Sequence, residues 1–456
     1  MNTLINKTFD EVMDKKDLIS PDKVHETISK YMLADGFDFV LDLNHSHGVN
    51  LVDAKSGDSY LDFFTFFASS ALGINHPKIN NDYVKDKIIT AALNKPSNSD
   101  IYTTQMAEFV ETFARFALPS YMKHLFFVSG GTLAVENGLK VAFDWKVQKN
   151  FMKGIKEEKG QQVIHFKQAF HGRSGYTLSL TNTEINKIKY FPKFNWPRIS
   201  NPKLIFPIEE NLSLIKENES IAINEIYDAI KNNKDDIAAI IIEPIQGEGG
   251  DNLFRREFFI KLREIADEND ILLMFDEVQT GFGLTGKLWA YEHYVQPDII
   301  SFGKKAQVCG IMVSSRIDEV PENCFRVSSR INSTWGADLT DMVRSKFIME
   351  VMEEENLVHN AELMGKYLLE QLYEVQSEFP KLINSARGLG LMCSFNLPNS
   401  ALRNEFKSLC YKEKLLILGC GEKSIRFRPP LNVQYDDINN ALNIIRKVLF
   451  LMASFN

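Results

Sequence analysis

The sequence predicts an α/β protein with a large, mostly parallel sheet and a smaller α+β domain built from both chain ends. Short apolar runs alternate with helix-length segments from Tyr83 to about Ile317, which is typical of a parallel sheet covered by helices. Outside that region, residues 37–66 alternate apolar runs with turn residues, and residues 381–456 carry a mixed helix and strand pattern. A chain of 456 residues also exceeds what one hydrophobic core usually organises.

The candidate strands of the large sheet are five apolar runs, at 124–128, 162–166, 238–242, 271–275 and 299–302. The charged segment 156–234 is expected to be mostly surface loops and an exposed helix. The spacing predicts an unbroken helical stretch over 339–376. The domain boundaries we expect are 1–80 for an N-terminal arm with part of the small domain, 81–345 for the large domain, and 346–456 for the rest of the small domain.

The composition is that of an ordinary globular protein and excludes several functional classes. The net charge of −8 leaves no basic footprint for nucleic acid. The five cysteines form no Cys-x-x-Cys pair and are expected to be reduced, and His45 and His47 lack nearby cysteine ligands for a metal. The first twenty residues contain no apolar signal segment, and no run approaches the ~18 apolar residues of a membrane span. We therefore expect a cytoplasmic protein without a nucleic-acid, membrane or metal partner.

A lysine and an aspartate carry the strongest chemical signal in the chain. Asp276 follows the apolar run 271–275, and Lys304 lies 28 residues later in another strand-to-loop segment. A lysine amine can form a Schiff base with the aldehyde of pyridoxal 5′-phosphate, while a carboxylate keeps the pyridinium nitrogen of that cofactor protonated. The pair therefore predicts a pyridoxal phosphate site. A strand that ends in a capping acid is the alternative interpretation of Asp276.

Two neighbouring residues bear on this site. Gln279 is placed to donate a hydrogen bond to the phenolate oxygen of the cofactor. Lys305 adjoins Lys304, and adjacent side chains of an extended segment point in opposite directions. Only one of the two lysines is therefore expected to reach the site.

The segment 128–132 is a candidate phosphate site. It follows a strand and opens a predicted helix, where the N–H groups of Gly131 and Thr132 and the helix dipole would attract an anion. The Thr132 hydroxyl can add a further hydrogen bond. A tight strand-to-helix turn capped by Ser129 explains the same residues without a ligand. The segment also lacks the Gly-Lys-Ser/Thr ending of a nucleotide-binding loop.

Two further loops add candidate ligand contacts. In one, Phe170 can stack on a pyridine ring and Arg173 can hold a carboxylate with two hydrogen bonds. In the other, Glu243 and Glu248 flank flexible glycines at the end of an apolar run, where open α/β sheets bind ligands. A hydrophobic anchor, a surface arginine and a solvated turn are the corresponding structural interpretations.

Together these motifs, in this order over about residues 35–450, resemble the class-III pyridoxal phosphate-dependent aminotransferases of fold type I. Within the class the chain is most similar to the lysine 6-aminotransferases (lysine ε-aminotransferases), in segments 129–137, 171–179, 303–310 and 331–336. The wider class usually has paired glycines where this chain has Cys309-Gly310. This departure fits the lysine branch.

The resemblance implies roles around the cofactor. Lys304 would bind it covalently and later move protons between substrate and cofactor. Asp276 would hold the pyridinium and Gln279 the phenolate, with Phe170 stacked on the ring. The phosphate would be held by Gly131, Thr132 and, from the neighbouring subunit, Thr334. A homodimer with a shared active site follows from that last contact.

The resemblance also implies two carboxylate sites. Arg173 would hold the remote carboxylate of either substrate, and Arg426 the α-carboxylate of glutamate or 2-oxoglutarate, with Arg428 ranked second for that role. Glu248 would pair with Arg426 while lysine is bound and swing away when glutamate arrives. Asn332 is expected among the substrate-binding residues.

The implied reaction transfers the ε-amino group of L-lysine to 2-oxoglutarate. It gives L-glutamate and 2-aminoadipate 6-semialdehyde, which cyclises to piperideine-6-carboxylate. Another ω-aminotransferase, acting on ornithine or 4-aminobutyrate, is the alternative with the same fold. A phosphate-binding module that uses segment 129–132 without covalent chemistry is the alternative from a different class.

Overall fold

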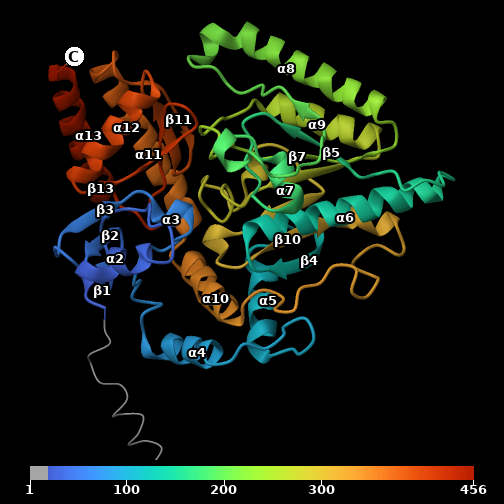
Figure 1. The fold of residues 1–456 in the computed structure, drawn as a ribbon, viewed down its shortest axis with the longest axis horizontal. Coiled ribbons are helices and arrows are strands. Elements are labelled where there is room, and N and C mark those ends of the chain that lie inside the picture. The colour runs from blue at the N-terminus through green and yellow to red at the C-terminus, as the bar shows by residue number, and fades with distance from the viewer. Residues whose placement is uncertain (1–18, 456) are drawn as a thin grey trace, which may run out of the picture.

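The computed structural model describes residues 19–455, and its largest element is a seven-stranded sheet with strand order β4-β10-β9-β8-β7-β5-β6 (Figure 1). The strands are β4 (Met122–Val128), β5 (Gln162–Phe166), β6 (Arg198–Ile199), β7 (Ile237–Ile242), β8 (Leu272–Asp276), β9 (Ile299–Phe302) and β10 (Cys309–Ser314). The five predicted strands are present within two residues of their expected bounds. All neighbours are parallel except β10, which pairs antiparallel with both β4 and β9. β10 was not among the predicted strands.

Helices cover both faces of this sheet, which explains its uniformly apolar strands. In β7, Ala239 and Ile241 pack on the side of α6 (Gly131–Met152), whereas Ile240 and Ile242 pack on the opposite side. That second side is covered by α8 (Ile208–Asn232) and α9 (Arg256–Glu268). In Figure 1, α8 and α9 lie above β5 and β7, and α6 lies below them.

A smaller α+β part combines segments from both chain ends. β1 (Leu41–His47), β2 (Asn50–Asp53) and β3 (Ser59–Asp62) form an antiparallel sheet, and the C-terminal strand β13 (Leu415–Leu416) joins β3 in parallel. Figure 1 shows these blue N-terminal strands beside the red C-terminal elements. The antiparallel sheet β11-β12-β15-β14 completes this part, with strands at Asn384–Leu389, Met392–Asn396, Ser424–Phe427 and Leu418–Cys420. The predicted fold class is confirmed.

The remaining helices connect these sheets or cover them. They are α2 (Val24–Ser29), α3 (Thr65–Ala68), α4 (Asp82–Ala92), α5 (Thr104–Phe116), α7 (Gly175–Leu180), α10 (Leu339–Glu354), α11 (Leu357–Glu378), α12 (Ser400–Lys412) and α13 (Tyr435–Phe455). Short 3₁₀ helices include η3 (Ile185–Lys187) and η5 (Lys304–Ala306). The proposed domain boundary at 345/346 falls inside α10, so the two domains would be joined by a continuous helix. Within residues 19–455, no helix is long and apolar enough to cross a membrane.

One expectation about helices was wrong. The stretch 339–376 is broken between α10 and α11, because Asn356 adopts a left-handed conformation with φ 50°. Asparagine tolerates that conformation better than most residues, so it can end one helix and start another. The helix expected to be exposed within 156–234 is α8, and most of its residues are exposed or half-buried, whereas Ile215, Ala222 and Ile226 on one face are fully buried.

Gly365 fixes how α11 packs on the turn between β11 and β12. A Cβ at this position would lie 2.0 Å from the carbonyl carbon of Gly390, a backbone atom that side-chain rotation cannot move away. Gly365→Ala should therefore lower stability by about 1–3 kcal/mol, although alanine is otherwise the better helix former. Thermal unfolding measures the effect, with Lys366→Ala on the exposed side of the same helix as control. An unchanged melting temperature for Gly365→Ala would contradict this packing.

Candidate active site

A cavity of about 470 Å³ lies at the carboxyl ends of the central strands. Predicted site residues that line it are Gly131, Thr132, Phe170, Arg173, Glu248, Asp276, Gln279 and Lys304. They lie at the carboxyl end of β8 or in the segments that follow β4, β5, β7, β8 and β9. Ligands of open α/β sheets bind at this edge, where successive loops converge.

Lys304 and Lys305 point to different places. The Lys304 Nζ lies in the cavity and donates to the carbonyl of Phe67 at 3.0 Å, whereas the buried Lys305 Nζ donates to the carbonyl of Ala68 at 2.8 Å. The two lysines do not lie in an extended segment, as the sequence predicted, but begin the 3₁₀ helix η5. Of these two, only Lys304 lines the cavity.

The environment of Lys304 favours its neutral amine. Burial, followed by the positive charge of Arg426, lowers the pKa of Lys304 from 10.5 to about 8. The pKa of Lys305 is also lowered well below its usual value, by burial and then by the charges of Arg428 and Lys304. A neutral amine is the nucleophile that condenses with an aldehyde, so Lys304 is primed for that chemistry.

The carbonyls of Phe67 and Ala68, which accept the hydrogen bonds of the two lysines, belong to a left-handed turn that the sequence did not indicate. Residues 65–68, assigned as α3, have φ values of 44°, 52°, 60° and 66°. This conformation costs about 1–2 kcal/mol per non-glycine residue, so the surrounding contacts must impose it. Asp62 Oδ1 accepts from the N–H groups of Phe64 and Thr65 at 2.9 and 2.7 Å, and the lysines hold the other end. The turn places Phe67 at the wall of the cavity.

Asp276 is buried at the end of β8 with a defined orientation. Its Oδ2 lies 2.8 Å from His171 Nδ1, and its Oδ1 accepts from the N–H of Val278 and the hydroxyl of Ser301. His171 therefore supports the carboxylate. Glu243, the residue that follows β7, accepts from two backbone N–H groups, and burial followed by the charge of Asp276 raises its pKa well above the usual value.

Glycines bring backbone to the phosphate end of the cavity. Gly130 precedes α6 with φ 114°, so the helix begins at Gly131 with free N–H groups facing outward from its first turn. A Cβ on Gly131 would lie 2.9 Å from a Val278 methyl. Gly172, with φ 123°, brings its loop so close that a Cβ would lie 2.4 Å from the Thr132 hydroxyl. Only glycine fits at position 172, which explains the glycine between Phe170 and Arg173 in this loop.

The three arginines differ in what they contact. Arg173 is exposed at the cavity with its guanidinium 6.0 Å from the Phe170 ring centroid. Arg426 on β15 is buried beside the cavity, and its Nη2 lies 2.9 Å from Glu248 Oε2. Its Nε has no hydrogen-bond partner among the described residues. Arg428 is already engaged by Asp251 and Gln279, which makes it the weaker candidate for a substrate carboxylate.

Lys187 is a cavity residue that sequence reasoning missed. Its Nζ lies 2.6 Å from Glu248 Oε1 and 5.4 Å from the Phe170 ring centroid. It belongs to the charged segment 156–234, where nothing in the local pattern separates a lysine that reaches the site from those in solvent. Only the tertiary structure identifies it.

Thr334 and Asn332 do not line this cavity. Both are exposed on the loop that precedes α10, and the Thr334 carbonyl accepts a hydrogen bond from Ser97 at 2.7 Å. Their expected contribution to the active site of a second subunit stays a prediction.

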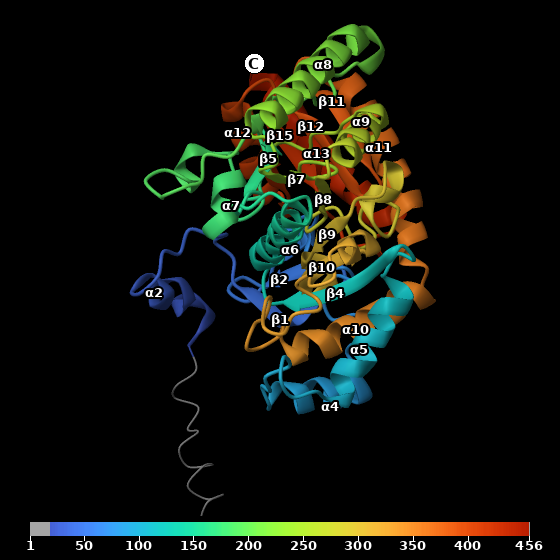
Figure 2. The ribbon, with the colours of Figure 1, turned by 90° about the vertical axis from the view of Figure 1, so that its right-hand side faces the viewer.

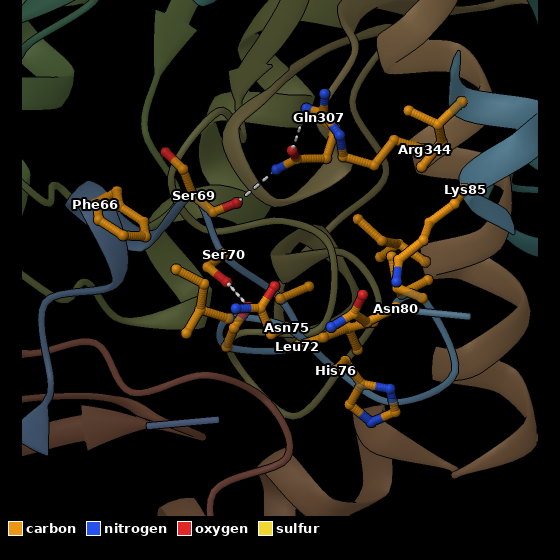
Figure 3. A pocket seen from close by; sticks show the side chains of 16 residues that line it. Phe66, Ser69, Ser70, Leu72, Asn75, His76, Asn80, Lys85, Gln307 and Arg344 are labelled. Atoms are coloured by element: carbon orange, nitrogen blue, oxygen red, sulfur yellow. Dashed lines mark hydrogen bonds between the residues drawn. The ribbon is translucent and has the colours of Figure 1, made fainter. Parts of the chain in front are cut away.

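A second cavity, of about 440 Å³, shares Ser69 with the first (Figure 3). Gln307, from the loop that carries Lys304, donates to the Ser69 carbonyl at 2.8 Å and accepts from Arg344 at 3.3 Å. The loop of the reactive lysine therefore forms part of both cavities.

Comparison with known protein families decides the class. The family model of class-III aminotransferases matches residues 32–449, which is most of the chain. The chain is a class-III aminotransferase. Enzymes of this class depend on pyridoxal 5′-phosphate, so this aminotransferase uses that cofactor.

The aminotransferase has close relatives among characterised proteins. It is 51% identical over 432 residues to the L-lysine-epsilon aminotransferase of Mycobacterium tuberculosis, covering 94% of this chain and 96% of that one. It is 48% identical over 428 residues to the enzyme of that name from Streptomyces clavuligerus, covering 92% and 93%. The structure of lysine aminotransferase from M. tuberculosis in the internal aldimine form matches with a TM-score of 0.93 and 50% identity, over 95% of this chain and all of that one. An ornithine aminotransferase from Toxoplasma gondii, at 21% identity and a TM-score of 0.79, shares the fold.

The cavity of the aminotransferase fits pyridoxal phosphate by its own chemistry. The amine of Lys304, whose pKa is lowered to about 8, suits the aldehyde, and the buried carboxylate of Asp276 suits the ring nitrogen. Phe170 offers an aromatic face, and the free N–H groups at the start of α6 suit a phosphate. Within residues 19–455, no group of three or more histidine, cysteine, aspartate or glutamate residues is arranged to hold a metal ion.

The lowered pKa of Lys304 predicts how cofactor loading depends on pH. Because the neutral amine reacts, the rate at which cofactor-free protein binds pyridoxal phosphate should rise with pH to about 8 and level off above it. A stopped-flow absorbance series measures the rate. Pyridoxamine phosphate, which has no aldehyde, serves as control and should lack this step. A rate that climbs steadily towards pH 10 would show an ordinary lysine.

Proposed function

We propose that this enzyme transfers the ε-amino group of L-lysine to 2-oxoglutarate. The products are L-glutamate and 2-aminoadipate 6-semialdehyde, which cyclises to piperideine-6-carboxylate. Relatives called L-lysine-epsilon aminotransferase, at 45–51% identity over more than nine-tenths of the chain, support this assignment. The observation that carries it is the ion pair between Glu248 and the buried Arg426, next to the reactive amine.

The two arginines would divide the carboxylates of the substrates. Arg173, exposed at the cavity, holds the α-carboxylate of lysine or the γ-carboxylate of glutamate. Arg426, whose buried Nε lacks a hydrogen-bond partner within residues 19–455, holds the α-carboxylate of glutamate or 2-oxoglutarate. A guanidinium binds a carboxylate with two parallel hydrogen bonds, which fixes the orientation of the substrate.

Glu248 allows one pocket to accept both substrates. Lysine that presents its ε-amine has no carboxylate near Arg426, and a buried cation without a partner is strongly destabilising. Glu248 supplies the negative charge in that state. When glutamate binds, its α-carboxylate takes the place of Glu248 on Arg426. Arg426 therefore faces a carboxylate with either substrate, that of Glu248 when lysine is bound and that of the substrate when glutamate is bound.

The remaining residues orient the cofactor and move the proton. Bound pyridoxal phosphate supplies the electron sink that stabilises negative charge on the substrate carbon. Asp276, oriented by His171, would keep the ring nitrogen protonated, Gln279 would donate to the phenolate, and Phe170 would offer its aromatic face to the ring. The amine of Lys304 takes the proton from the substrate carbon, for which a pKa of about 8 is suitable near neutral pH.

The active unit would be a homodimer. Thr334 would reach the cofactor phosphate of the partner subunit, and Asn332 would contact substrate there. Both residues are exposed and lie outside the cavity of their own chain, which is compatible with a role in trans.

The amino donor can be identified from the first half-reaction. Holoenzyme mixed with L-lysine should convert to the pyridoxamine form, while ornithine and 4-aminobutyrate should convert at least tenfold more slowly, a difference of about 1.4 kcal/mol. Absorbance follows the conversion, and mass spectrometry with ε-¹⁵N lysine shows which nitrogen was lost. Conversion by ornithine without conversion by lysine would contradict the assignment.

Removal of Glu248 should affect the two half-reactions unequally. Glu248→Ala leaves Arg426 uncompensated unless a substrate carboxylate binds it, as glutamate does and lysine does not, so kcat/KM for lysine should fall about tenfold or more relative to that for glutamate. Single-turnover measurements with each amino donor give the ratio. Glu422→Ala, an exposed glutamate outside the cavity, is the control. Equal losses of kcat/KM in both half-reactions would show that Glu248 does not distinguish lysine from glutamate.

A further inference from the structure

Glu248 is held by two cations, one on each carboxylate oxygen. Arg426 Nη2 lies 2.9 Å from Oε2, and Lys187 Nζ lies 2.6 Å from Oε1. Burial alone would raise the pKa of Glu248, but the charges and hydrogen bonds of Arg426 and Lys187 lower it below the usual value. The carboxylate is therefore ionised and shared between two positive partners.

The two cations come from separate parts of the fold. Arg426 lies on β15 in the sheet formed near the C-terminus, whereas Lys187 ends η3, in the segment that follows α7 (Figure 2). The Lys187 side chain is 13% exposed and that of Arg426 is 4% exposed. Lys187 also pairs with Glu184, but Glu184 is 61% exposed, and solvent weakens an exposed pair of that kind.

The charges around Glu248 decide what Lys187 does. While lysine occupies the pocket, Glu248 faces both cations, and this cluster carries one net positive charge. When the α-carboxylate of glutamate takes Arg426, the cluster contains two carboxylates and two cations and is neutral. Without Lys187, the displaced Glu248 would be a partly buried anion with no partner, which is strongly unfavourable.

We propose that Lys187 is a positioning residue that receives Glu248 when a substrate carboxylate displaces it from Arg426. The inference rests on the proposed function and deepens it, because it names the partner of Glu248 in the second half-reaction. Lys187 selectively favours substrates with two carboxylates. Its contact with the Phe170 ring keeps the ammonium group at the cavity in both states.

The test compares Lys187→Met with the wild-type enzyme in each half-reaction. Methionine keeps most of the apolar stem and removes the charge. The ratio of kcat/KM for glutamate to that for lysine should fall about tenfold, as expected for one lost partner of a partly buried carboxylate. Lys187→Arg should restore the ratio, and Lys189→Met, an exposed lysine of the same segment, should leave it unchanged.

A double variant separates this role from a structural one. In a Glu248→Ala background there is no carboxylate to receive, so Lys187→Met should no longer lower the ratio. If Lys187 only anchors its loop, the variant will slow both half-reactions equally, and will do so with or without Glu248. Either of these results would overturn the proposal.

Equilibrium binding provides a readout that does not require turnover. Glutarate, which carries two carboxylates, should bind Lys187→Met holoenzyme about tenfold more weakly than wild type by calorimetry, whereas pentanoate should be affected little. Equal weakening of both ligands would contradict the proposal. Failure of wild-type enzyme to react with lysine would instead overturn the proposed donor, and the glutarate comparison would still test Lys187.

Discussion

The site depends on a geometric constraint: parallel strands end at the same edge of a sheet. β5, β7, β8 and β9 run in one direction, so the loops that follow them converge, although they are separated by many residues in the chain. An amine, a carboxylate and an aromatic ring therefore meet in one cavity. The antiparallel strand β10 begins at Cys309, shortly after the 3₁₀ helix that carries Lys304, and pairs with both β9 and β4.

The electrostatics of the cavity follow from where each charge is buried. Lys304 loses proton affinity because it is desolvated beside Arg426, and Glu248 stays ionised because two cations face it. Asp276 is held by His171, and Arg428 is already occupied by Asp251. Each charged group therefore has a partner or a stated chemical use. This arrangement keeps a polar cavity compatible with a folded protein.

The sequence predicted those parts of the site that local pattern determines. Asp276 and Lys304 follow apolar strands, and Gly131 opens a helix with clear periodicity, so each was found from its immediate neighbours. Lys187 and the left-handed turn at 65–68 were not found, because both depend on contacts with residues far away in the chain. The helix break at Asn356 was not visible in the sequence either, because its left-handed conformation is only one of several that asparagine tolerates. The roles predicted for Thr334 and Asn332 depend on contacts with a second subunit, which the pattern of a single chain does not describe.

Chemical labelling of one side chain shows whether Lys304 is the residue that binds the cofactor covalently. Holoenzyme is reduced with borohydride, which makes the bond between cofactor and lysine permanent, and is then digested and mapped by mass spectrometry. The account predicts a pyridoxyl group on Lys304, with Lys305 unmodified because its amine is buried against the Ala68 carbonyl. A label on Lys305, on any other lysine, or on none would contradict it.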